Sequence, residues 1–178
     1  LESRCEKMEY IHFPRYDAPV YGELISKFLR GDFGDNDRVH PQLVALLFAE
    51  DRHGAAPRMK KALSEGATVL LDRYVYSNIA YQCAKLSDPS EIEELREWII
   101  NTEFGEFDLP RPDLNIYLDV PIGFVKDRLS SVRQGHDRDY LEGSKDIHES
   151  DLEFQKKVKS VYERQASLDS RFIRIDCS

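Results

Sequence analysis

Four short runs of β-branched, aromatic and other apolar residues alternate with longer stretches in which apolar residues recur every three or four positions. Short apolar runs are typical of strands, and continuous ones of strands that are buried in a parallel sheet. We therefore predict strands at 9–13, 67–71, 114–120 and 172–175. The stretches between them predict helices, because residues three and four apart share one helical face.

Glycine and proline mark the boundaries of the predicted helices. Gly31 ends the first helix, and Pro41 fits the first turn of the second. Pro57 predicts the start of a further helix, which Gly66 ends. Strands that alternate with helices favour an α/β fold, an open parallel sheet in a single domain spanning residues 1–178.

Charged residues follow two of the predicted strands, where an open parallel sheet binds its ligands. Arg15 and Tyr16 follow the first strand, and Asp72 and Arg73 follow the second. The fixed fork of donors on an arginine matches the oxygens of a phosphate. The dipeptide Asp-Arg occurs five times in the chain, so by itself it indicates an ordinary surface ion pair. Its position at the end of a buried strand distinguishes Asp72-Arg73.

Two residue pairs at helical spacing suit a flat base. Phe48 and Arg52 are four residues apart, so a ring and a guanidinium share one helical face. Taken alone, Phe48 fits the apolar stripe of its helix better than a ligand site. Asn78 and Tyr81 are three residues apart, and an asparagine amide can bind a base edge or satisfy a cap or turn.

A polar, glycine-containing segment at about 133–148 lies between two predicted helices. It contains Arg133 and Arg138, and Asp146 and Glu149 stand at its far end. A segment of this size is either a lid over a site or a solvated loop. The acids can bind a metal, orient arginines or complement a helix N-terminus.

The composition narrows the class of protein. The chain has 178 residues, with 25 lysines and arginines against 33 aspartates and glutamates, a net charge of −8. An acidic chain is not expected to bind nucleic acid through its phosphates. We also expect no membrane span and no secretory leader. The scattered cysteines Cys5, Cys83 and Cys177 predict reduced thiols in a cytoplasmic protein.

Four segments carry a resemblance to a known family. They are Phe13-Pro14-Arg15-Tyr16, Phe48-Ala49-Glu50-Asp51-Arg52, the run from Asp72 to Tyr81, and Leu109-Pro110-Arg111-Pro112-Asp113. In this order and spacing they resemble thymidylate kinase, a P-loop nucleoside monophosphate kinase. The resemblance implies about five parallel strands with helices on both faces and a lid at about 133–148. It also implies phosphoryl transfer from ATP to dTMP, a requirement for Mg²⁺, and a homodimer.

The resemblance assigns several residues to the nucleoside part of dTMP. Phe48 would stack on thymine, and Arg52 would bond to the O4 edge. Asn78 would address the base near N3. Tyr81 would lie at the 2′ carbon and exclude a ribose hydroxyl, and Phe13 is counted with these substrate-binding residues.

Other residues are assigned to the phosphates. Arg15, Tyr16 and Arg73 would hold the acceptor phosphate, and Asp72 would orient an arginine or metal-bound water. The second pKa of a phosphate monoester is about 6, so the acceptor is largely dianionic and needs no general base. Phosphoryl transfer then depends on positioning and on cations that stabilise the developing charge.

The predicted lid completes the assignment. Arg133, with Arg138 second, would neutralise charge on the transferred group. Asp146 and Glu149 match acids at the end of the family's lid, Asp146 on the substrate side and Glu149 as a partner for Mg²⁺.

One family motif is missing from the sequence. Thymidylate kinases begin with a P-loop, Gly-x-x-x-x-Gly-Lys-Ser/Thr, between the central first strand and the first helix, and no such segment occurs here. Residues 1–7 resemble the end of that first helix. We therefore expect this chain to lack roughly two dozen N-terminal residues, judged against P-loop anatomy, and some C-terminal helix. An intact mass of 20.7 kDa for the purified protein would contradict this expectation.

Two other functions remain open at this point. The same sheet and lid serve kinases for other nucleotides or for deoxynucleosides. A non-catalytic nucleotide-binding module is favoured if the P-loop is truly absent.

Overall fold

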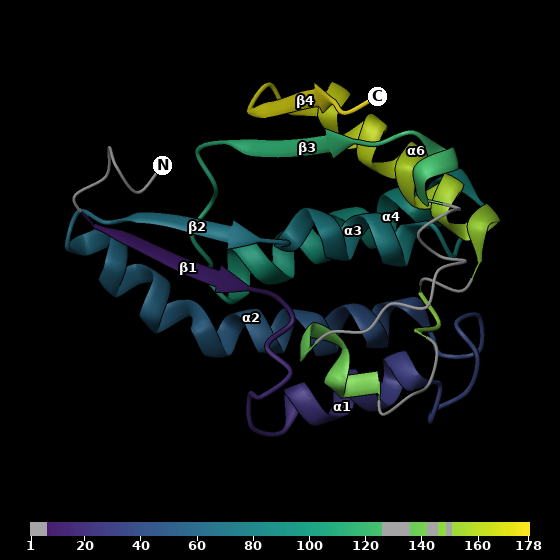
Figure 1. The fold of residues 1–178 in the computed structure, drawn as a ribbon, viewed down its shortest axis with the longest axis horizontal. Helices are drawn as coiled ribbons and strands as arrows, with labels where there is room; N and C mark the ends of the chain where they lie inside the picture. The colour runs from purple at the N-terminus through teal and green to yellow at the C-terminus, as the bar shows by residue number, and fades with distance from the viewer. Residues whose placement is uncertain (1–6, 126–135, 142–145, 149–150) are drawn as a thin grey trace.

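The computed structural model describes residues 7–125, 136–141, 146–148 and 151–178, and only the backbone of residues 136–138. Strands and helices alternate along the chain (Figure 1). In order, the elements are β1 (Met8–His12), α1 (Tyr21–Arg30), α2 (Pro41–Ser64), β2 (Thr68–Asp72), α3 (Val75–Cys83), α4 (Pro89–Ile100), the π-helical turn η1 (Asn101–Glu106), β3 (Asn115–Asp119), the 3₁₀ turn η2 (His136–Leu141), α6 (Leu152–Leu168) and β4 (Phe172–Asp176).

The four predicted strands are confirmed, and they form two parallel pairs. β1 pairs with β2, and β3 pairs with β4. All four arrows point in the same direction in Figure 1, as in an open parallel sheet. The two pairs are not hydrogen-bonded to each other within the described residues. Where we expected about five strands in one sheet, the described part of the chain contains four strands in two pairs.

Several apolar side chains on these strands are exposed. Each of them lies directly opposite another exposed apolar residue on the neighbouring strand, so each strand pair presents an apolar face to solvent. These residues are Tyr10 beside Leu70, Ile116 beside Ile173, and Leu118 beside Ile175. Side chains alternate between the faces of a strand, which is why neighbouring positions such as Ile11 are buried.

The sequence predicted the end of α1 at Gly31 correctly, but its prediction of a helix start at Pro57 was wrong. Gly31 ends α1 in the left-handed conformation (φ 84°), which glycine adopts without strain. Pro57 does not start a helix but lies inside α2. A proline cannot donate a hydrogen bond to the carbonyl four residues earlier, here that of His53. Both residues are exposed, so water can satisfy that carbonyl and α2 continues.

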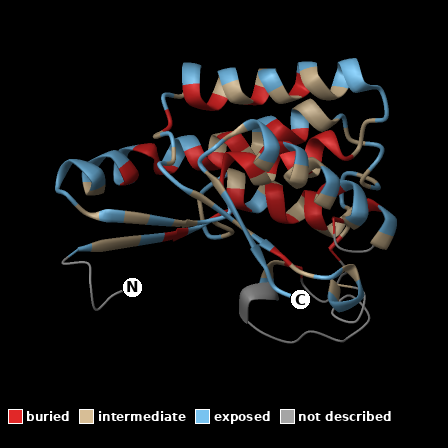
Figure 2. Ribbon diagram, turned by 90° about the horizontal axis from the view of Figure 1, so that it is seen from above, coloured by how far each residue is buried: buried red, intermediate tan, exposed pale blue. Residues whose placement is uncertain are grey.

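The main hydrophobic core lies between the first strand pair and helices α2, α3 and α4. Met59 of α2, Ile79 of α3 and Ile99 of α4 are fully buried in it. Figure 2 shows the buried residues concentrated where the helices meet. Burying one such side chain contributes roughly 1.5–3 kcal/mol. Helix α3 also contacts α6, so the core holds α3 on several sides directly after the end of β2.

Candidate functional site

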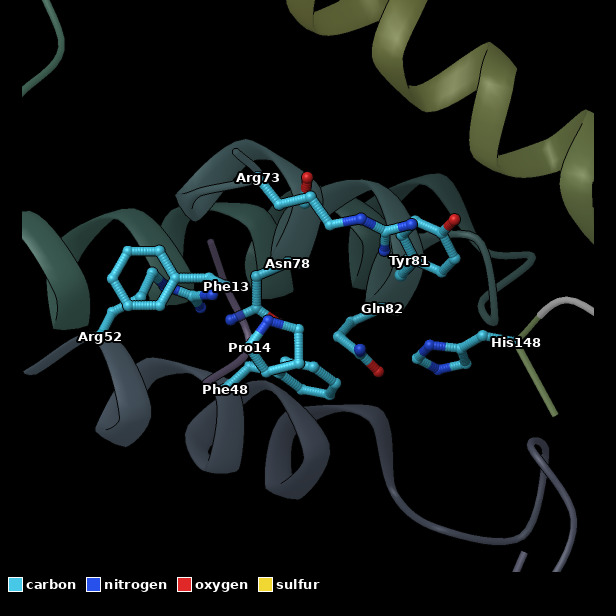
Figure 3. A pocket seen from close by; sticks show the side chains of 10 residues that line it. Phe13, Pro14, Phe48, Arg52, Arg73, Asn78, Tyr81, Gln82 and His148 are labelled. Atoms are coloured by element: carbon cyan, nitrogen blue, oxygen red, sulfur yellow. The ribbon is translucent and has the colours of Figure 1, made fainter. Parts of the chain in front are cut away.

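A pocket opens beside the carboxyl ends of β1 and β2, where the sheet rule places a ligand (Figure 3). Its walls come from the chain after each strand, from α2 and α3, and from the segment before α6. They are Phe13, Pro14, Phe48, Arg52, Arg73, Ser77, Asn78, Tyr81, Gln82 and His148. Six of these ten were predicted from the sequence, namely Phe13, Phe48, Arg52, Arg73, Asn78 and Tyr81.

Arg52 is held by a residue that the sequence analysis missed. Its Nε and Nη2 donate to the two carboxylate oxygens of Glu103 at 2.5 Å and 2.8 Å. Arg52 is 2% exposed and Glu103 is fully buried, so each charge depends on the other. The bonds occupy two of the nitrogens of Arg52. Glu103 lies in η1, in a segment without a recognisable motif, and no sequence signal identified it.

Glu103 also fixes the amide of Asn78. The Nδ2 of Asn78 donates to Glu103 Oε1 and to the Ala45 carbonyl, both at 2.9 Å. Because both partners accept only, the amide cannot be flipped. Its Oδ1 is buried and has no partner among the described residues. The side chain therefore has a free acceptor oxygen.

Phe48 packs in the core, as one of the two alternatives weighed from the sequence predicts, and its stacking on a base stays a prediction. It packs with Ile25 and Phe28 between α1 and α2, and it also lines the pocket. Beside it, the His148 ring lies nearly parallel to the Phe48 ring, with 6.2 Å between centroids. Both rings line the pocket.

His148 and Gln82 are pocket residues that the sequence analysis did not identify. His148 is 5% exposed and Gln82 is 1% exposed. His148 Nε2 and Gln82 Oε1 have no partner among the described residues. Burial, with the nearby charges of Lys85 and Arg73, holds the pKa of His148 well below its ordinary value, so its imidazole is neutral. A single histidine and a single glutamine carry no spacing signal that would have found them.

Arg73 lies directly after β2 in a left-handed conformation, with φ 62°. This conformation is unfavourable for a residue with a Cβ. The guanidinium of Arg73 lies 5.3 Å from the centre of the Tyr81 ring. Strained backbone of this kind often marks a site where a side chain must be aimed.

Arg15 does not line this pocket. Its backbone N–H and its Nε bond the Asp51 carboxylate, each at 2.9 Å, and Nη2 bonds the Asp51 carbonyl. Burial raises the pKa of Asp51, and the bonds and charge of Arg15 oppose that rise. The convergence of Arg15 and Arg73 on one anion therefore stays a prediction.

Tyr16 and Asp146 both contact Tyr140. The rings of Tyr16 and Tyr140 stack at 3.8 Å between centroids. The Tyr140 hydroxyl donates to Asp146 at 2.8 Å, and the same carboxylate accepts from the backbone N–H of His148 at 2.8 Å. Asp146 is thus bonded within its own segment. Arg133 and Glu149 lie outside the described residues, as does the side chain of Arg138.

The residues that the structure describes offer neither a clustered metal site nor a membrane-spanning helix. Three or more histidines, cysteines or acids do not come together there in a way that could hold a metal ion. Among the same residues, every helix is too short or too polar to cross a membrane.

Comparison with known proteins identifies the family. The family profile described as "Thymidylate kinase" matches residues 1–178. The chain belongs to the thymidylate kinase family. These proteins are nucleoside monophosphate kinases, and eight of the ten residues of the pocket, all but Gln82 and His148, come from the segments that carried the resemblance in the sequence.

Individual thymidylate kinases show how far the similarity extends. The chain is 33% identical to the enzyme of Mycobacterium tuberculosis over 156 residues, 87% of this chain and 70% of that protein. It is 29% identical to the enzyme of Plasmodium falciparum over 179 residues, all of this chain and 71% of that protein. The solved thymidylate kinase of Candida albicans has the same fold, with a TM-score of 0.67 at 23% identity over 98% of this chain and 74% of that one.

Proposed function

We propose that this protein transfers the γ-phosphoryl group of ATP to dTMP and produces dTDP. Membership of the thymidylate kinase family supports this reaction. The observation that carries the choice of substrate is the fixed amide of Asn78, which leaves an acceptor oxygen in a side chain of the pocket.

An acceptor at this point selects among pyrimidines. Thymine and uracil carry a hydrogen on N3 and can donate to Asn78 Oδ1, whereas N3 of cytosine is an acceptor and would oppose it. A buried polar pair that cannot form costs about 1–3 kcal/mol. Phe48 would supply the flat apolar surface on which the ring stacks. Arg52 uses Nε and Nη2 to bond Glu103, and its Nη1 would donate to O4 of the base.

The chemistry on the acceptor side needs cations rather than a base. The dTMP phosphate is already largely ionised, with a second pKa of about 6. Arg73 lies at the carboxyl end of β2 and lines the pocket, where it would hold that phosphate. Arg15 and Tyr16, and the lid arginines Arg133 and Arg138, are proposed for the same anionic groups on the basis of the family resemblance.

The residues present also fit a magnesium ion. In nucleotide kinases Mg²⁺ is held by one or two carboxylates with waters and the substrate phosphates, not by a protein cage. Asp72 supplies a half-exposed carboxylate next to Arg73. Asp72, with Glu149 as a second candidate, would hold the ion or its waters. When bound, Mg²⁺ would neutralise charge on the phosphates.

A coupled assay of ADP production tests the proposed reaction. With ATP present, we expect turnover with dTMP and dUMP, and at least about tenfold lower kcat/KM with dCMP because of the opposed acceptors. UMP tests the exclusion of a ribose hydroxyl by Tyr81, and Tyr81→Ala should narrow the gap between UMP and dUMP. Binding of dTMP without any ADP production would instead support a non-catalytic nucleotide-binding module.

We also propose that the protein is a cytoplasmic homodimer, as the family resemblance implies. Size-exclusion chromatography with light scattering should give twice the mass of one chain. A single-chain mass at working concentration would contradict the dimer, and recovery of the protein in a membrane or secreted fraction would contradict the location.

A further inference from the structure

The last residue of β2, Asp72, is held by three hydrogen bonds from β1 and from Phe13, the residue that follows β1. The backbone N–H of Phe13 donates to the Asp72 carbonyl at 2.9 Å. The Tyr10 hydroxyl donates to Asp72 Oδ2 at 3.1 Å, and His12 Nδ1 lies 3.0 Å from the same oxygen. Both the main chain and the carboxylate of Asp72 are therefore held by the neighbouring strand and the residue that follows it.

Strand register explains why these side chains meet. His12 and Asp72 are direct partners in the parallel β1–β2 pair. Tyr10 lies two residues before His12 and so on the same face. A long aromatic side chain can reach the diagonal neighbour across a strand pair, and Tyr10 reaches Asp72 in this way.

The chemistry of the groups fixes the direction of each bond. A carboxylate only accepts hydrogen bonds, so the hydrogen of the His12 ring that faces Asp72 must be on Nδ1. The phenol hydroxyl of Tyr10 carries its hydrogen at neutral pH, so it is the donor in its bond to Asp72. Both bonds end on Oδ2. Oδ1 is therefore the oxygen left for another group.

We propose that His12 is a positioning residue for Asp72, assisted by Tyr10. This inference rests on the proposed function, in which Asp72 orients an arginine or metal-bound water beside the acceptor phosphate. A half-exposed carboxylate would otherwise turn between rotamers in solvent. Two donors on Oδ2 hold it in one orientation and leave Oδ1 available at the carboxyl end of β2, next to Arg73.

The exposure of the pair means that it contributes little to the stability of the fold. The side chains of His12 and Asp72 are 43% and 52% exposed, and exposed ion pairs contribute little to folding. Removing His12 should therefore lower turnover without lowering stability appreciably.

The experiment is a set of variants assayed with ATP and dTMP. We expect His12→Ala to lower kcat roughly tenfold, the usual effect of one lost hydrogen bond to a charged group, with KM for dTMP unchanged. His12→Asn keeps an N–H donor near the position of Nδ1 and should restore most of the rate. The control is His53→Ala, because His53 is also a half-exposed histidine beside a carboxylate, that of Glu50, and should change nothing.

Two further measurements separate this inference from the proposed reaction. In an Asp72→Asn background, His12→Ala should have no additional effect on kcat; full additivity would overturn the inference. Nitrogen NMR of the His12 ring should show the hydrogen on Nδ1 in the wild type, and a ring protonated only on Nε2 would also overturn it. If the wild type produces no dTDP, the proposed function fails, while the NMR result still decides whether His12 holds Asp72.

Discussion

Glu103 accepts two hydrogen bonds from Arg52, and both residues are buried. The two residues are separated by 51 positions in the sequence. Glu103 joins η1 to α2 through Arg52 and to α3 through Asn78. One carboxylate thus sets the positions of two side chains that line the pocket.

Loss of Glu103 should destabilise the protein and weaken its selectivity. Glu103→Ala leaves the Arg52 charge buried without a partner, which should lower the free energy of unfolding by about 3–5 kcal/mol. The Asn78 amide also loses an anchor, so the preference for dTMP over dCMP should shrink. Urea denaturation and the coupled assay measure the two effects. Glu106→Ala, at an exposed position of the same turn, is the control; an equal loss there would contradict this account.

Replacing Arg73 should lower activity whichever residue takes its place, whereas the effect on stability should depend on the new residue. Arg73→Ala and Arg73→Gly both remove the guanidinium and should abolish most activity. Only glycine relieves the positive φ of 62°, so Arg73→Gly should be the more stable variant by about 1 kcal/mol. Thermal unfolding compares them directly. Arg73→Ala that keeps wild-type kcat but melts earlier would place Arg73 in a structural role instead.

Lys85 should make stability depend on pH. Its Nζ has no hydrogen-bond partner among the described residues and lies 4.8 Å from the centre of the Phe28 ring. Burial lowers its pKa from 10.5 to about 7. Between these values the unfolded chain keeps a proton that the folded protein has released, so the free energy of unfolding should rise with pH across this window.

Lys85→Met should remove that part of the pH dependence and raise the free energy of unfolding near pH 7, where the buried charge costs most. Urea denaturation at both ends of the window measures the difference between variant and wild type. Lys61→Met, with a side chain that is 77% exposed, is the matched control. A slope that is the same in wild type and Lys85→Met would show that Lys85 keeps its ordinary pKa.

Phe48→Ala should weaken binding of dTMP more than binding of ATP, because only the base of dTMP is expected to stack on this ring. Phe48 also packs between α1 and α2, so some loss of stability is expected as well. Leu47→Ala is the matched control, since Leu47 packs in the same cluster but does not line the pocket. Titration calorimetry with each nucleotide decides; equal weakening of both in Phe48→Ala would point to general destabilisation.

Local patterns were reliable where neighbouring residues decide the structure. The strands and the end of α1 at Gly31 follow from side-chain alternation and from the freedom of glycine to adopt positive φ. The predicted start of a helix at Pro57 was wrong because proline removes only one helical hydrogen bond, and on an exposed face water can replace that bond. Helical spacing predicted that Phe48 shares a face with Arg52 and Asn78 with Tyr81, and the pocket contains both pairs.

The sequence by itself determined the order of strands and helices, the family, and six residues of the pocket, because these depend on short-range periodicity and on motifs that stay together along the chain. Only the tertiary structure decided that Glu103 holds Arg52 and Asn78, that Arg15 bonds Asp51, and that His148 enters the pocket. Such contacts join segments far apart in sequence. A buried charge or amide takes whichever partner the packing of the helices brings within hydrogen-bond distance, and no local pattern records that choice.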